Sequence, residues 1–73
     1  MAINMYHVHE ADARAAANAE YTAAPEFPAL EAEAAKRGYR HATLGEINAS
    51  ADSAPWAVEL HCWRGGLWVR VPA

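Results

Sequence analysis

The histidines are the residues of this chain whose chemistry could hold a metal ion. His7 and His9 stand two positions apart, so on a strand both imidazoles would share one face with Cα atoms about 6.6 Å apart. His61 or His41 could add a ligand from a neighbouring strand, but zinc needs three or four ligands. Cys62 would point to the face opposite His61. We therefore treat His7, His9 and His61 as weak metal candidates and expect no cofactor.

Nucleophilic catalysis has less support than metal binding. Cys62 is expected on the apolar face of a strand, where a thiol behaves as a small hydrophobe with little thiolate character. Ser50 and Ser53 flank Asp52 in a polar stretch, but no glycine-framed elbow surrounds them. The chain also has no phosphate-binding glycine loop and no His-Glu metalloprotease motif. We expect a protein that is not an enzyme and has no catalytic residues.

Two tryptophans near the C-terminus, with cations beside them, are the strongest candidates for binding. Trp63 and Trp68 are accompanied by Arg64, Arg70 and His61. Aromatic rings next to arginine can stack on the bases of single-stranded nucleic acid. The same composition is typical of the residues that dominate protein interfaces. Because the net charge of −3 opposes a phosphate backbone, we expect a protein partner and consider nucleic acid unfavoured.

The charges divide unevenly along the chain. Residues 1–33 hold six carboxylates and a single cation, whereas residues 34–73 hold five cations and three carboxylates. Carboxylates on helices can present a negative surface that imitates nucleic acid to a partner. The candidates for such a surface are Glu20, Glu26, Glu31 and Glu33. The simpler interpretation is that acidic helices solvate themselves.

The tryptophans are expected on a β-hairpin that spans residues 56–71. Gly65 and Gly66 accept the positive φ angles of a two-residue turn, and this turn would pair Trp63 with Trp68. The inner face would then be apolar, formed by Trp56, Val58, Leu60, Cys62, Val69 and Val71. The outer face would carry Glu59, His61, Trp63, Trp68 and Arg70.

Four further segments precede the hairpin. Residues 3–9 are rich in β-forming side chains and predict a first strand. Alanine-rich residues 11–24 predict a helix that ends before Pro25, and residues 27–37 predict a second, with one continuous bent helix as the alternative. Residues 39–47 predict another strand, in which Gly45 would mark a bulge. The polar residues 48–55 predict a loop.

These elements define a single α+β domain over residues 1–73. We expect two layers: a three- to four-stranded, mainly antiparallel sheet, in the order β-α-α-β-β-β, with two short helices packed on one face. The last three strands would form a meander. The second face of the sheet would stay open and present Trp63 and Trp68. The alternative is that the second helix, or the first strand and its loop, covers this face and both rings lie in the core.

Composition limits the size of the core and the setting. A domain of 73 residues buries only roughly 60% of its unfolded surface. One cysteine cannot form an internal disulfide, and no apolar run approaches the roughly 20 residues of a membrane span. The first residues do not follow the pattern of a signal peptide. We expect a cytoplasmic monomer or homodimer that does not enter a membrane.

The function expected from these features is that of a small non-catalytic protein-binding module. It would inhibit or antagonise a larger host complex, by analogy of type with the anti-defence and anti-CRISPR proteins of phages and mobile elements. One alternative is a structural homo-oligomer built through the sheet face or edge. Another is a domain that binds single-stranded nucleic acid or a metal ion.

Overall fold

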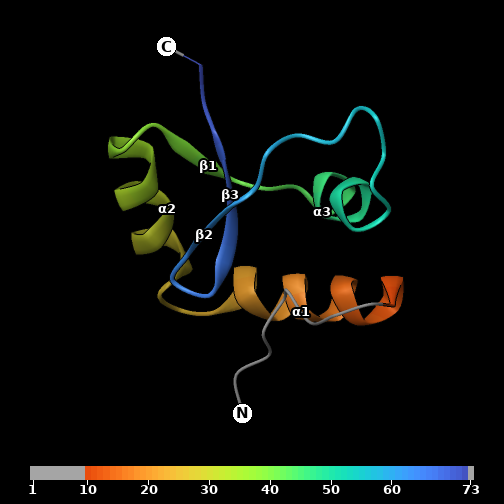
Figure 1. Cartoon of the computed structure of the whole chain (residues 1–73). Coiled ribbons are helices and arrows are strands. Elements are labelled where there is room, and N and C mark those ends of the chain that lie inside the picture. Colours follow the sequence, from red (N-terminus) through yellow and green to blue (C-terminus); the bar gives the residue numbers. More distant parts are fainter. Residues whose placement is uncertain (1–9, 73) are drawn as a thin grey trace.

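The computed structural model describes residues 10–72 of the 73-residue chain. Its elements follow the order α1 (Ala11–Ala23), α2 (Phe27–Lys36), β1 (Tyr39–His41), α3 (Leu44–Ala51), β2 (His61–Trp63) and β3 (Gly66–Arg70) (Figure 1). The α+β class and the antiparallel sheet are confirmed. The strand expected at residues 3–9 lies outside the described part, within which the sheet has three strands.

The strand order is β1-β3-β2, so β3 is central and is antiparallel to both neighbours. The expected meander is therefore wrong, because β1 pairs with β3 and not with β2. The reason is α3, which leads the chain from β1 past the end of the sheet before it returns along β2 on the other side of β3 (Figure 1). Hydrogen bonds from Ala42 N–H to the Leu67 carbonyl and from Val71 N–H to the Gly38 carbonyl extend the β1-β3 pairing.

The predicted hairpin is confirmed, but its turn lies one residue earlier than expected. Arg64 and Gly65 form the turn with φ angles of 52° and 78°, so Trp63 pairs with Gly66 and His61 pairs with Trp68. The partner of each residue of β2 therefore differs by two positions from the predicted partner. Because side chains alternate between the two faces of a strand, a shift of two leaves each side chain on its predicted face. The tryptophans consequently share one face, as predicted, although they are not direct partners.

The third helix was missed because its start lies inside the predicted strand of residues 39–47. Thr43 caps α3: its Oγ1 accepts a hydrogen bond from Glu46 N–H at 3.1 Å, and its own N–H donates to Glu46 Oε1 at 2.9 Å. This reciprocal pair is a capping box, whose signature of threonine followed three residues later by glutamate is present in the sequence. Gly45 accordingly lies in the first turn of α3 and forms no bulge, and the loop expected to start at Asn48 begins after Ala51.

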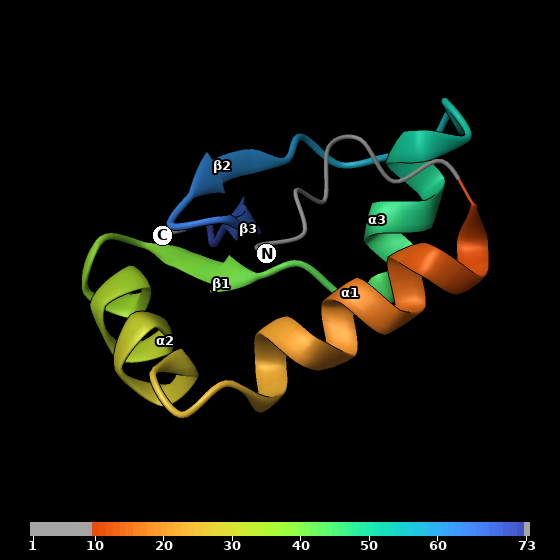
Figure 2. The ribbon, with the colours of Figure 1, turned by 90° about the horizontal axis from the view of Figure 1, so that it is seen from below.

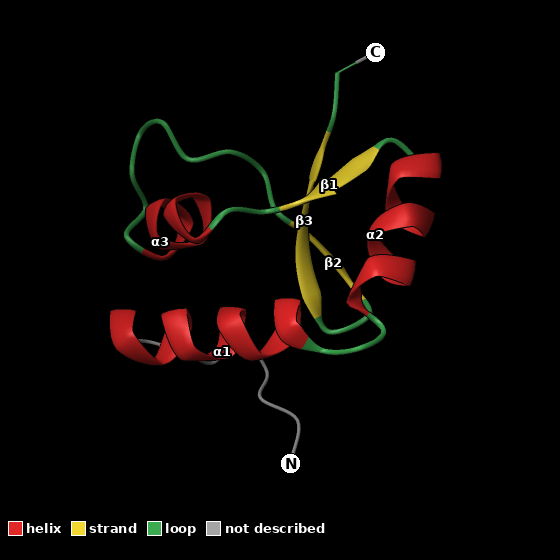
Figure 3. Cartoon of the chain, turned by 180° about the vertical axis from the view of Figure 1, so that it is seen from behind, coloured by secondary structure: helices red, strands yellow, loops and turns green. Residues whose placement is uncertain are grey.

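Helices cover β3 on both faces. On one face Leu67 and Val69 pack with Ala17 of α1 and Ile47 of α3, and on the other Trp68 packs against α2. Figure 3 shows α2 and α3 on opposite sides of the strands, with α1 crossing beneath one end of the sheet. The two predicted helices are therefore not confined to one face, because α1 and α2 contact opposite faces of β3.

The alanines of α1 allow it to lie close to α3. Ala17 is buried in the core, and Arg14 is buried between the helices, where its Nε donates a hydrogen bond to Asn48 Oδ1 at 2.7 Å. Small side chains make this near approach possible, and the hydrogen bond to Asn48 offsets part of the cost of burying the guanidinium. None of the helices within residues 10–72 is both long and apolar enough to cross a membrane.

Candidate functional site

Trp68 is a core residue, which corrects the expectation that it faces a partner. Only 1% of its surface is exposed. The centroid of its indole ring lies 6.3 Å from the centroid of the Phe27 ring on α2 and 5.1 Å from the centroid of the His41 ring. Its Nε1–H donates to the backbone carbonyl oxygen of Trp63 at 2.9 Å. Because α2 covers this part of the sheet, Trp68 can support a binding surface from beneath but cannot contact a ligand.

Trp63, in contrast, is only half-buried and lies at the end of the sheet face that α2 leaves open. Its ring meets that of Trp68 edge-on at 5.5 Å. The guanidinium carbons of Arg37 and Arg64 lie 5.9 and 5.7 Å from the centroid of the Trp63 ring. At such distances a guanidinium is attracted to the electron-rich face of an indole. Two arginines from distant parts of the chain therefore hold one tryptophan near the surface.

A cavity of about 250 Å³ opens beside Trp63. It forms where α2 ends and no longer covers β2, and it is lined by Ala34, Arg37, Tyr39, His61, Cys62 and Trp63. The rings of Tyr39 and His61, two of these lining residues, meet edge-on at 5.2 Å. We call Arg37, Tyr39, His61, Trp63 and Arg64 together the arginine–aromatic surface. Tyr39 and Arg37 were missed by the sequence argument, because only the fold brings β1 and the end of α2 next to the hairpin.

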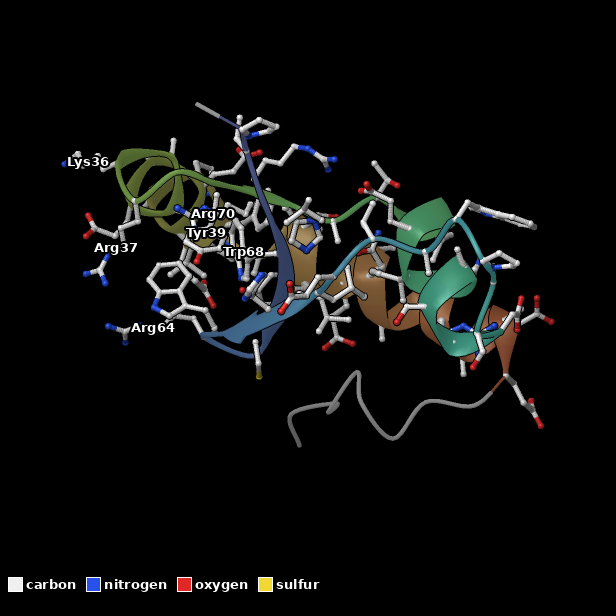
Figure 4. All side chains as sticks on the ribbon, turned by 45° about the horizontal axis from the view of Figure 1, so that its top comes forward. Lys36, Arg37, Tyr39, Arg64, Trp68 and Arg70 are labelled. Atoms are coloured by element: carbon white, nitrogen blue, oxygen red, sulfur yellow. The ribbon has the colours of Figure 1, made fainter. Side chains whose placement is uncertain are left out.

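Cations gather around the arginine–aromatic surface. Lys36, Arg37, Arg64 and Arg70 lie at one end of the molecule in Figure 4. Glu33 compensates part of this charge, since its carboxylate lies 3.2 Å from Arg37 and 4.0 Å from Lys36. Within the described residues neither Arg64 nor Arg70 forms an ion pair. The region thus keeps an excess of positive charge although the whole chain is acidic.

The four glutamates proposed as an acidic surface do not all remain available. Glu20, Glu26 and Glu31 are exposed as expected. Glu33 is half-buried and forms ion pairs with the basic end of α2, so it belongs to the arginine–aromatic surface more than to an acidic one.

No metal site is formed among residues 10–72, where no three histidine, cysteine, aspartate or glutamate side chains lie close enough to share an ion. His41 is enclosed by aromatic rings: it stacks on Tyr21 at 5.4 Å and meets Phe27 edge-on at 5.2 Å. Its Nε2 is buried and makes no hydrogen bond with the described residues. Burial lowers the pKa of His41 below its usual 6.5, which favours the neutral form of the ring. The candidates His7 and His9 lie outside the described residues.

Four residues that were expected on the apolar inner face are exposed: Trp56, Val58, Cys62 and Val71. Cys62 shares the face of Leu67, but β2 is an edge strand and its thiol is exposed. Trp56 is 77% exposed because β2 begins only at His61, so no strand partner holds the indole against the sheet. Together with Val58 it borders a second cavity, of about 330 Å³, against α3.

Comparison of the sequence with known protein families and with curated proteins, and of the structure with solved structures, found no match. The candidate function consequently depends on the geometry of the arginine–aromatic surface.

Proposed function

We propose that this protein is a small non-catalytic protein-binding module, which docks on a larger protein through the arginine–aromatic surface. The observation that carries the proposal is the placement of the Trp63 ring within 6 Å of both the Arg37 and the Arg64 guanidinium, beside an open cavity. Tryptophan, tyrosine and arginine are the residues that most often dominate the binding energy of protein interfaces.

The size of the cavity supports a protein partner over a free small molecule. Pockets for drug-sized ligands measure roughly 300–1,000 Å³ and enclose most of the ligand. The cavity beside Trp63 is smaller, at about 250 Å³, and it is open on one side. It is suited to one side chain that projects from a larger body.

The backbone at Arg64 gives independent support. Its φ of 52° belongs to the left-handed region, where two-residue hairpin turns favour asparagine or glycine. An arginine there costs conformational energy that the shorter residues avoid. A strained residue whose charged end lies next to a half-buried aromatic ring is expected where the side chain serves binding.

The role that follows is inhibition or recruitment by occupation of a partner's surface. The excess of cations around Trp63 favours an acidic patch on that partner, because complementary charge raises the rate of encounter and sets its orientation. A cytoplasmic setting belongs to the same proposal, since a reducing compartment keeps the exposed thiol of Cys62 from pairing with other thiols.

The test uses the wild type, Arg64→Gln and Ala13→Glu as baits in affinity capture. The captured protein is then purified, and its affinity for each of the three is measured by titration. Both substitutions lower the net charge by one, but Ala13 lies on the exposed side of α1, away from the hairpin. We expect Arg64→Gln to weaken binding at least about tenfold, as is typical of a central arginine. Ala13→Glu should leave the affinity unchanged, and an equal loss in both variants would contradict the proposal.

Single-stranded nucleic acid is the alternative ligand for the same surface. A fluorescent dT12 oligonucleotide should show no binding at physiological salt, where each phosphate contact is weakened by counterions. Binding that falls steeply with salt and is lost in Arg64→Gln would replace the protein partner with nucleic acid. Light scattering over a concentration series tests the homo-oligomer, for which the measured mass would double or rise further.

A further inference from the structure

In the part of the chain that the structure describes, the outer edge of β2 has backbone groups that pair with no other strand. The Leu67 carbonyl accepts a hydrogen bond from Ala42 N–H at 2.9 Å, so Leu67 directs its backbone polar groups toward β1. In an antiparallel pair, two opposite residues either exchange both hydrogen bonds or both point away from each other. Cys62 is opposite Leu67, and its N–H and C=O therefore point outward. Within residues 10–72 no strand pairs with that edge.

The two edges of the sheet differ in how they are protected. β1 lies between α2 and α3, which are only a few residues away at each end. Its middle residue, Arg40, is charged and donates two hydrogen bonds, of 2.8 and 2.9 Å, to the Glu46 carboxylate. Charged residues on an edge strand are one of the means by which proteins block strand addition. β2 has no such residue among His61, Cys62 and Trp63, and in Figure 2 it lies on the side of the sheet away from α1 and α2.

We propose that the edge of β2 receives an extended acidic segment of the partner protein as a fourth strand. This inference rests on the proposed function and specifies how the partner would bind. Main-chain hydrogen bonds to Cys62 would supply the pairing, and pockets for alternate side chains would supply the selectivity, as in other cases of strand addition. Because the side chains of a strand alternate between faces, one of them would enter the cavity between Tyr39, His61 and Trp63.

Charge determines the kind of segment. Arg64 stands at the turn end of β2 and Arg37 lines the cavity. Of the two carboxylates nearby, Glu33 faces Arg37 and Lys36, and Glu59 lies 3.9 Å from His61. Carboxylates two positions apart on the added strand would share a face and could approach both arginines. A nucleic acid could meet the same arginines, but it has no peptide N–H and C=O groups to pair with Cys62. Complementary charge and the outward backbone groups of Cys62 together select an acidic peptide.

The first experiment selects binders from a library of random displayed dodecapeptides and resynthesises the best. We expect enrichment of acidic residues on both sides of an apolar or aromatic residue. Cys62→Pro removes the outward N–H at a position where an edge strand tolerates proline, and Cys62→Ser keeps that N–H. The peptide should bind Cys62→Pro at least about tenfold more weakly, as the loss of a main-chain hydrogen bond implies, and should bind Cys62→Ser as it binds the wild type.

A second measurement does not depend on the folding of the proline variant. A series of peptides, each with a single N-methyl group, should lose affinity for the wild type at alternate positions only, because every second N–H of an added strand faces its neighbour. Loss at no position, or equal loss at all positions, would overturn strand addition. If the peptides remain sensitive to Arg64→Gln in that case, the proposed function stands and only the mode of binding is wrong. If dT12 binds and no peptide does, both proposals fail.

Discussion

The hydroxyl of Tyr21 donates a hydrogen bond to the backbone carbonyl oxygen of Arg64, 3.0 Å away, although the two residues are 43 positions apart. This bond joins the end of α1 to the turn of the hairpin. The ring of Tyr21 also lies directly against Gly66, where a Cβ atom would come within 2.5 Å of three of its atoms. The two adjacent glycines thus have different roles: Gly65 supplies a positive φ, and Gly66 supplies space.

The first prediction concerns this close approach. Gly66→Ala should lower the free energy of unfolding by about 1–3 kcal/mol, because the methyl group displaces the Tyr21 ring and overpacks the contact. Gly45→Ala is the control, since the nearest atom to its Cβ would be Thr43 Oγ1 at 3.9 Å. In the first turn of α3 it should raise stability by up to about 1 kcal/mol. Urea denaturation measures both, and an unchanged midpoint for Gly66→Ala would contradict the packing.

The second prediction separates stability from binding at Arg64. Asparagine adopts the left-handed conformation of this turn more readily than arginine. Arg64→Asn should therefore leave the free energy of unfolding unchanged or raise it by up to about 1 kcal/mol, with the lost contact to the Trp63 ring as the opposing effect. The same variant should bind the partner at least about tenfold more weakly. Stronger binding together with lower stability would show that Arg64 is retained for the fold.

The third prediction is a loss of stability in mild acid through His41. Burial holds its pKa below 6.5 in the folded protein, and the nearby Glu31 opposes this only in part. The unfolded chain therefore takes up the proton first as pH falls. The contribution of neutral His41 to the free energy of unfolding is complete above pH 6.5. It is lost progressively as pH drops from 6.5 toward the pKa of His41 in the folded protein.

Urea titrations at pH 7.5 and 5.5 measure this loss. In His41→Phe, which keeps an aromatic ring among Tyr21, Phe27 and Trp68, the difference between the two pH values should shrink. Because the other histidines are present in both proteins, the comparison isolates His41. An identical difference in both proteins would exclude His41 as its source.

The fourth prediction concerns the start of α3. Hydrogen bonds from Arg40 and from Thr43 N–H lower the pKa of Glu46 from 4.5 to about 2. Its contribution is therefore present above pH 4.5 and is lost as pH falls from 4.5 toward 2. Glu46→Gln keeps a side chain that can complete the capping box but removes the charge. This variant should lack that acid-dependent loss.

Thr43→Ala removes the cap itself and should destabilise the protein by about 1 kcal/mol at neutral pH. Thermal unfolding followed by circular dichroism measures the stability of Glu46→Gln and of Thr43→Ala relative to the wild type. If Thr43→Ala melted like the wild type, α3 would not depend on its cap.

Local patterns predicted much of the fold. Alanine density and Pro25 indicated two helices, a glycine pair indicated the hairpin, and the period of two placed Trp63 and Trp68 on the same face. Each of these depends on neighbours within a few residues, which the sequence displays directly. The capping box of α3 was equally local, and it was missed because β-forming residues just before it favoured a strand.

Tertiary packing decided which of those residues can bind. Trp63 and Trp68 are the same residue type on the same face of the hairpin. However, α2 buries Trp68 and ends before it covers Trp63. Arg37 and Tyr39 joined the surface only because β3 is the central strand and brings β1 beside the hairpin. Strand order and helix placement depend on contacts between distant segments. The sequence by itself therefore determined two of the helices, the hairpin and the shared face of Trp63 and Trp68. The tertiary structure alone decided which face is covered and which edge has no partner strand within residues 10–72.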